Sequence, residues 1–127
     1  QQPTSETRWL NWQPIYSGSG SLTYTSVTTT LAKYRILAEK CEVELRLSGT
    51  TGGTTSNTVY ATAPFEATQS ANAIAIGALL YAVSSSGFGG IHITAGTPDK
   101  LSFLNYNAGN WTLTAGAVFN GFGSYEI

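Results

Sequence analysis

Apolar and polar positions alternate with a period of two along much of this chain, which is typical of β-strands that face a core on one side. The alternation is clearest in residues 41–47, CEVELRL, where the odd positions are apolar and the even positions are charged. The stretch 33–37 precedes it, and Glu39-Lys40 between the two predicts a hairpin turn. Further strands are predicted at residues 22–30, 58–62, 73–83, 90–94, 100–106 and 117–127.

Two segments have patterns that more than one kind of secondary structure could explain. Residues 73–83 form the longest apolar run and would tolerate a helix, but Gly77 and the strands on either side favour a core strand. Residues 49–57, GTTGGTTSN, contain no apolar anchor and predict a flexible loop. About eight short strands with frequent turn signals indicate an all-β, antiparallel, jelly-roll-like β-sandwich. We expect one domain at residues 9–127, preceded by a polar leader or linker at residues 1–8.

The composition argues against several classes of function. Charged residues make up 10% of the chain, against about 25% in ordinary domains. Six basic residues and a net charge of −1 do not provide the electrostatic footprint of nucleic-acid binding. The apolar run at 73–83 is too short to span a bilayer, so no membrane insertion is expected. The single cysteine, Cys41, excludes a disulfide within the chain.

The charges are also unevenly distributed. Residues 33–46 hold seven of the 13 formal charges, whereas residues 47–127 hold only four. A monomer with so little charge over most of its length is poorly protected against self-association. The pattern favours a subunit that buries this surface against copies of itself. The alternative is a monomer with a neutral surface rich in hydroxyl groups.

Few residues have the chemistry of a catalytic or metal site. His92 is the only histidine, and Asp99 is the only aspartate available to orient it. We interpret His92 as a strand residue that faces solvent or a subunit interface. Glu42 and Glu44 share one strand face, at about the separation of glycosidase carboxylates. Their neighbours of opposite charge favour ion-paired surface residues instead, so we expect no enzyme activity, no cofactor and no metal.

The aromatic residues suggest a binding role. The segment from Asn105 to Trp111, NYNAGNW, combines two aromatic rings with three asparagines. Aromatic faces stack on the C–H surfaces of sugars, and neighbouring amides bond their hydroxyl groups. We therefore identify Asn105, Tyr106, Asn107, Asn110 and Trp111 as a candidate ligand-binding loop. The alternative is that Tyr106 and Trp111 close a turn and pack on the core.

Several short stretches resemble the small C-terminal β-sandwich domains of tailed-bacteriophage tail-fibre and head-fibre proteins. These stretches are residues 12–20 (WQPIYSGSG), 33–35 (KYR) leading into 41–44 (CEVE), 48–54 (SGTTGGT), 60–64 (YATAP) and 122–127 (FGSYEI). Together they extend over residues 9–127. Where the family often has glycine before the second of these strands, this chain has Ala38-Glu39-Lys40.

The resemblance implies a virion protein exposed at the virion surface in the extracellular phase. Such domains are homotrimers without cofactors, and their partners are other virion proteins and host-surface glycans. Three functions follow as hypotheses. The first is a fibre-tip or receptor-binding domain, the second is a capsid decoration or head-fibre protein that stabilises the virion, and the third is a non-viral carbohydrate-binding module.

Overall fold

Nine β-strands make up the secondary structure that a computed structural model describes for residues 6–68 and 73–127. The described residues contain no helix, which confirms the prediction of an all-β fold, and none of them forms a helix able to cross a membrane. The strands are β1 (Glu6–Asn11), β2 (Tyr16–Gly18), β3 (Leu22–Leu37), β4 (Lys40–Gly53), β5 (Val59–Thr62), β6 (Ala73–Val83), β7 (Ser85–Thr94), β8 (Thr97–Leu104) and β9 (Ala115–Glu126).

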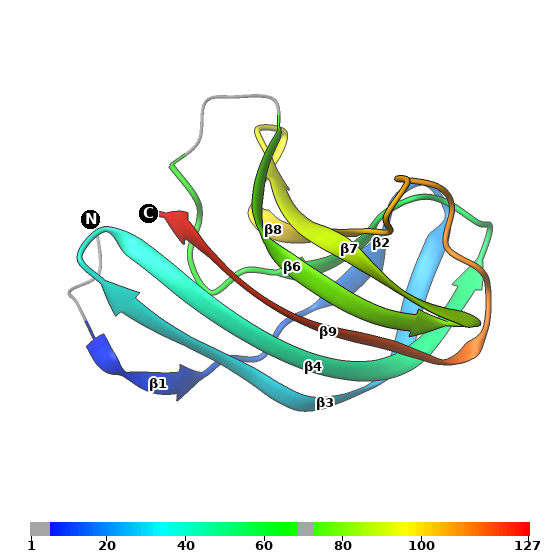
Figure 1. Cartoon of the computed structure of the whole chain (residues 1–127), viewed down its shortest axis with the longest axis horizontal. Helices are drawn as coiled ribbons and strands as arrows, with labels where there is room; N and C mark the ends of the chain where they lie inside the picture. The colour runs from blue at the N-terminus through cyan, green and yellow to red at the C-terminus, as the bar shows by residue number, and fades with distance from the viewer. Residues whose placement is uncertain (1–5, 69–72) are drawn as a thin grey trace.

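All nine strands belong to one antiparallel sheet with the order β1-β3-β4-β9-β6-β7-β8-β5-β2. The long strands β3, β4 and β9 lie side by side, and the sheet curls around one interior (Figure 1). The curl brings the edge strand β2 back against β3. The hydroxyl groups of Tyr16 and Thr29 lie 2.8 Å apart, and the ring of Tyr16 packs edge-on against Tyr24 at 5.7 Å.

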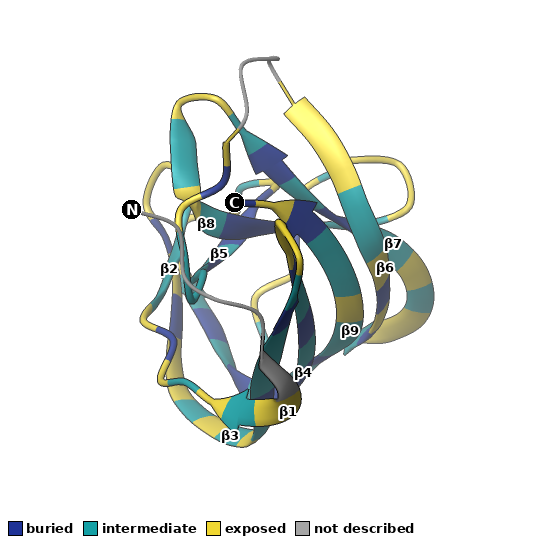
Figure 2. Cartoon of the chain, turned by 90° about the vertical axis from the view of Figure 1, so that its left-hand side faces the viewer, coloured by how far each residue is buried: buried dark blue, intermediate teal, exposed yellow. Residues whose placement is uncertain are grey.

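The core occupies the concave side of the curled sheet. In residues 41–47 every odd position is buried and every even position is more exposed, which confirms the predicted alternation of inward-facing and outward-facing residues. Buried and less buried bands alternate along the strands in Figure 2. The ring of Phe119 on β9 lies at the centre of an aromatic cluster. Its centroid is 5.1 Å from Tyr24, 5.4 Å from Phe103 and 5.0 Å from Trp111.

The prediction of a flexible loop at residues 49–57 is wrong for its first half, because β4 continues to Gly53. This half pairs with β3 on one side, and residues 49 and 50 also pair with β9 on the other. Thr51 is buried, and its hydroxyl donates to the carbonyl of Thr112 at 2.7 Å. Neighbouring strands thus provide the hydrogen bonds and the burial that hold this half as a strand, although its own sequence has no apolar residue.

Other boundaries also differ from the predictions. Residues 22–37 form one continuous strand, β3, with register shifts near Ser26, which has a left-handed φ of 54°. The short strand β2 was not predicted. Strand β1 starts at Glu6, inside the expected leader, because it pairs with the outer edge of β3. Residues 1–5 of that leader lie outside the described residues.

Strands β7, β8 and β9 also begin earlier than predicted. Strand β7 starts at Ser85, β8 includes Pro98, and β9 starts at Ala115. Strand β6 has the predicted bounds, so its long apolar run is a strand and not a helix. A hairpin joins β3 to β4 as expected, but Ala38 and Glu39 form its turn, because Lys40 already belongs to β4. Ala38 adopts there the left-handed φ of 56° that glycine favours.

Candidate ligand-binding loop between β8 and β9

The segment that joins β8 to β9, orange in Figure 1, lines a hollow of about 250 Å³. Residues of β6 and the start of β7 form the opposite wall, among them Tyr81 and Ser85. All five residues of the predicted site line this hollow: Asn105, Tyr106, Asn107, Asn110 and Trp111. The structure therefore brings the predicted residues together around one concave surface.

Asn105 organises the loop through its own side-chain amide. Its Nδ2 donates to the Gly109 carbonyl at 3.0 Å, and its Oδ1 accepts from the Gly109 amide at 2.8 Å. The backbone amide of Ala108 donates to the Asn105 carbonyl at 3.1 Å, and Ala108 has a left-handed φ of 57°. Asn107 adds a further bond, because its Oδ1 accepts from the Gly109 amide at 2.9 Å. The turn is thus held by hydrogen bonds before any ligand arrives.

Trp111 anchors the loop to the core. Only 2% of its surface is exposed, and its indole Nε1 donates to the Phe103 carbonyl at 3.1 Å. Its ring packs edge-on against Tyr81 at 4.8 Å and against Phe119 at 5.0 Å. Its backbone amide donates to the Ser56 carbonyl at 2.9 Å. The buried ring has no free face for a sugar, so for Trp111 the packing alternative describes the structure.

Tyr106 has the opposite environment, with 78% of its surface exposed. Asn107 and Asn110 are also exposed beside the hollow. No Asp, Glu, Lys, Arg or His residue is among the described residues that line the hollow. An open aromatic face with amide groups beside it suits a neutral ligand that has both C–H surfaces and hydroxyl groups.

His92 lies on β7, directly across from Ser102 on β8. Within residues 6–68 and 73–127, the buried His92 Nδ1 and Ser102 Oγ have no hydrogen-bond partner. Asp99 is exposed at the far end of β8. Ser102 was not singled out by sequence reasoning, because an isolated serine in a strand carries no local signal.

The glutamates on β4 lie on the outer side of the sheet. Arg35 on β3 and Glu42 form an ion pair with a 2.5 Å separation between Nε and Oε1, and the Arg35 guanidinium lies 4.8 Å from the centroid of the Trp9 ring. This arrangement agrees with the interpretation of Glu42 as an ion-paired surface residue, and for Glu44 the interpretation stays a prediction. Across the described part of the chain, no group of three or more His, Cys, Asp and Glu residues is placed to hold a metal ion.

Cys41 is buried at the start of β4. The pKa of its thiol is raised to about 11, chiefly by burial; a hydrogen bond with Tyr125 acts in the opposite direction, and the nearby Glu42 carboxylate adds to the rise. A thiol with this pKa is protonated at neutral pH and is a weak nucleophile.

Comparison with protein-family models, with curated proteins and with solved structures finds no match to this chain.

Proposed function

We propose that this chain is a non-enzymatic bacteriophage virion protein, a fibre-tip or receptor-binding domain that forms a homotrimer and adheres to host-surface glycans. The observation that carries the binding role is the β8–β9 loop. It presents the exposed Tyr106 with Asn107 and Asn110 around an uncharged hollow. In this proposal the curled sheet provides the layers of a jelly-roll-like sandwich, displayed on the virion surface.

The binding residues have separate tasks. The ring of Tyr106 stacks on the C–H face of a sugar, and the amides of Asn107 and Asn110 bond hydroxyl groups. Asn105 and Trp111 hold the loop in place from below. Because the loop is already ordered, little conformational entropy is lost on binding.

Trimerisation would strengthen adhesion without further contacts at each site. A shallow site of this kind gives weak binding to a single sugar. Three linked copies that engage one glycan-coated surface raise the overall avidity, by about 10²–10⁴ in favourable geometries. This fits a protein whose task is attachment to a repetitive surface.

The proposal is tested by measuring glycan binding with matched variants. We expect a glycan array to identify a neutral ligand for the wild-type protein, and Tyr106→Ala to lower its affinity at least about tenfold, or ~1.4 kcal/mol. Ile15→Ala is the control, because Ile15 is an exposed apolar residue outside the hollow. Equal affinity of Tyr106→Ala and wild type, or no binding to any glycan, contradicts the proposal.

A second candidate is a capsid decoration or head-fibre protein that stabilises the virion. The broad apolar outer surface of β6, β7 and β9, which is suited to contact with other proteins, favours it. Thermal inactivation of virions with and without the protein separates the two functions. Stabilisation of the virion without any glycan effect on melting temperature supports the second candidate.

A further inference from the structure

The outer surface of the sheet is divided into a charged half and an apolar half. The charged half lies over β3 and β4 and contains Lys33, Arg35, Glu42, Glu44 and Arg46. The neighbouring strands β9, β6 and β7 contain no charged residue except Glu126 at the end of β9. We call the outer surface of β9, β6 and β7, bordered by β4, the apolar face.

The register places large apolar side chains next to small ones on this face. One row across the sheet runs from Glu44 through Phe122 and Ala78 to Gly90. The next row runs from Arg46 through Asn120 and Leu80 to Phe88.

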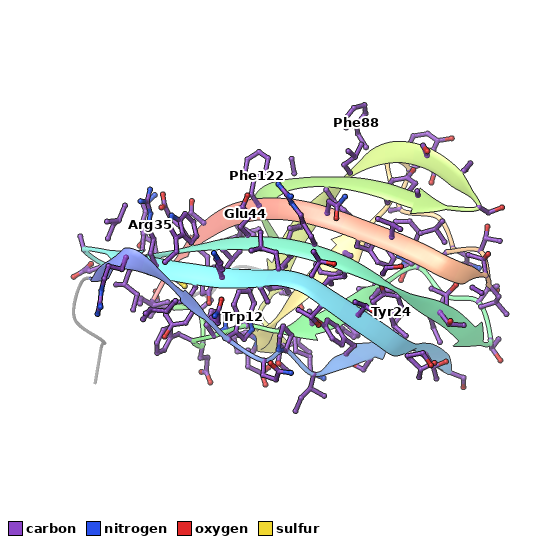
Figure 3. All side chains as sticks on the ribbon, turned by 90° about the horizontal axis from the view of Figure 1, so that it is seen from below. Trp12, Tyr24, Arg35, Glu44, Phe88 and Phe122 are labelled. Carbon is purple, nitrogen blue, oxygen red and sulfur yellow. The ribbon has the colours of Figure 1, made fainter. Side chains whose placement is uncertain are left out.

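Two phenylalanines protrude from these rows. Phe88 is 75% exposed and Phe122 is 64% exposed. In Figure 3 they project from the same side of the sheet, and Glu44 lies close to Phe122. An apolar hollow of about 320 Å³ lies between them, with Leu80 and Ala78 on its floor and Glu44 and Arg46 at its β4 side.

Such a face is unusual for a solvated sheet. The outward side of an antiparallel strand normally carries polar residues, and contiguous exposed apolar patches mark contact surfaces. Phe122, Leu80 and Phe88 instead occupy outward positions, and no lysine or glutamate interrupts them. This part of the surface has the composition of an interface and not of a solvated face.

We infer that three copies of this chain assemble through the apolar face around a threefold axis, so that the apolar face of each copy is covered by the apolar faces of the other two. The face is complementary to itself in shape, because protruding phenyl rings lie beside a hollow that is large enough to receive one. It is also complementary in charge, because Glu44 and Arg46 border the same hollow and the carboxylate of one copy meets the guanidinium of another. The inference rests on the self-assembly in the proposed function and identifies the surface that makes it.

Phe122 lies where the apolar face meets the charged half of the sheet. Its strand, β9, pairs with β4 on one side and with β6 on the other, and Glu44 is its partner on β4. In a threefold assembly the interface is heterologous, so the part of the face around Phe122 in one copy is covered by a different part of the face of the next copy. A charge introduced at this position is therefore buried against an apolar surface in every copy, which disfavours assembly.

The test is the mass in solution, measured by light scattering on a size-exclusion column. We expect the wild type to contain three chains and Phe122→Asp to contain one, with unchanged circular dichroism and unchanged glycan binding per chain. Ile15→Asp is the matched control, because Ile15 is 72% exposed but lies outside the apolar face, and it is expected to keep the wild-type mass.

The outcomes distinguish this inference from the proposed function. If the wild type is a multimer and both Phe122→Asp and Phe88→Asp keep its mass, another surface joins the copies, and only the inference fails. If the wild type is a monomer at all concentrations, the inference and the trimer both fail, while the glycan site is still judged by Tyr106→Ala. If Phe122→Asp does not fold, the milder variant Phe88→Ser takes its place. The inference is overturned if Phe88→Ser forms a multimer with the mass of the wild type and with the same dependence of mass on protein concentration.

Discussion

Two aromatic residues five positions apart on one loop are expected to respond to truncation in opposite ways. Trp111→Ala removes a buried ring that packs against Tyr81 and Phe119 and donates to the Phe103 carbonyl. Tyr106→Ala removes a ring that is mostly in water. We expect Trp111→Ala to destabilise the fold and to weaken binding only indirectly, and Tyr106→Ala to weaken binding alone.

The magnitude follows from the burial of the indole. An aromatic side chain buries about 150–250 Å², and about 25 cal/mol per Å² gives ~4–6 kcal/mol for the whole side chain. The retained alanine methyl and a compact unfolded state reduce this, so we expect a loss of about 3–5 kcal/mol in the free energy of unfolding. Tyr106→Ala is expected to change it by less than about 0.5 kcal/mol.

The assay is urea unfolding followed by circular dichroism, so that the lost indole does not remove the signal. Trp111→Phe serves as a milder variant, because it keeps an aromatic ring but removes the indole N–H that donates to the Phe103 carbonyl. It is expected to cost about 1–3 kcal/mol. A loss below about 1 kcal/mol for Trp111→Ala, or equal losses for Trp111→Ala and Tyr106→Ala, refutes the assignment of the indole to the core.

Three further predictions test the strand packing, the loop and the buried thiol. Gly77→Ala is expected to lower the free energy of unfolding in urea by about 1–3 kcal/mol, because an added Cβ meets the Phe122 carbonyl of the paired strand. Gly96→Ala is the control, because Gly96 has open space around it, and it is expected to change the free energy of unfolding by less than about 0.5 kcal/mol. Asn105→Ala is expected to accelerate hydrogen exchange at the Gly109 amide and to lower glycan affinity. The substitution removes the two bonds between the Asn105 side chain and Gly109 and leaves the Gly109 amide with the Asn107 side chain as its acceptor; unchanged exchange contradicts a bracing role of Asn105. The pKa of Cys41 is raised from 9.0 to about 11 in the folded protein, chiefly by burial, so the folded state favours the protonated thiol. The stability that the protonated Cys41 contributes is therefore complete below pH 9 and is lost as the pH rises towards 11. Urea midpoints measured from pH 7 to 11 are expected to fall above pH 9, and less steeply in Cys41→Ala; identical slopes for the two proteins contradict this.

Local periodicity was a good guide wherever one strand face meets the core. The alternation in residues 41–47 and the apolar run of β6 predicted the observed strands, because a strand with one buried side must repeat every two residues. It failed at residues 49–53, where the strand is held by bonds from Thr51 and by pairing with β3 and β9. Those bonds come from residues far away in the chain, so no local pattern reports them.

The candidate site shows the same division. Its five residues could be proposed together because they follow one another within seven positions of the chain, and a loop keeps neighbours close. Whether each ring faces inward or outward was open in the sequence. Trp111 is inward because Phe119, Tyr81 and Phe103 surround it from three other places in the chain.

By itself, the sequence determined that the chain is all-β, that few charges protect its surface, and that the loop before β9 is rich in amides and aromatic rings. Only the tertiary structure decided that β9 lies between β4 and β6, which joins Phe122, Leu80 and Phe88 into one apolar face beside a charged one. The physical reason is the range of the interactions. Side-chain alternation is a property of consecutive residues, whereas strand order depends on hydrogen bonds and packing between segments that are distant along the chain.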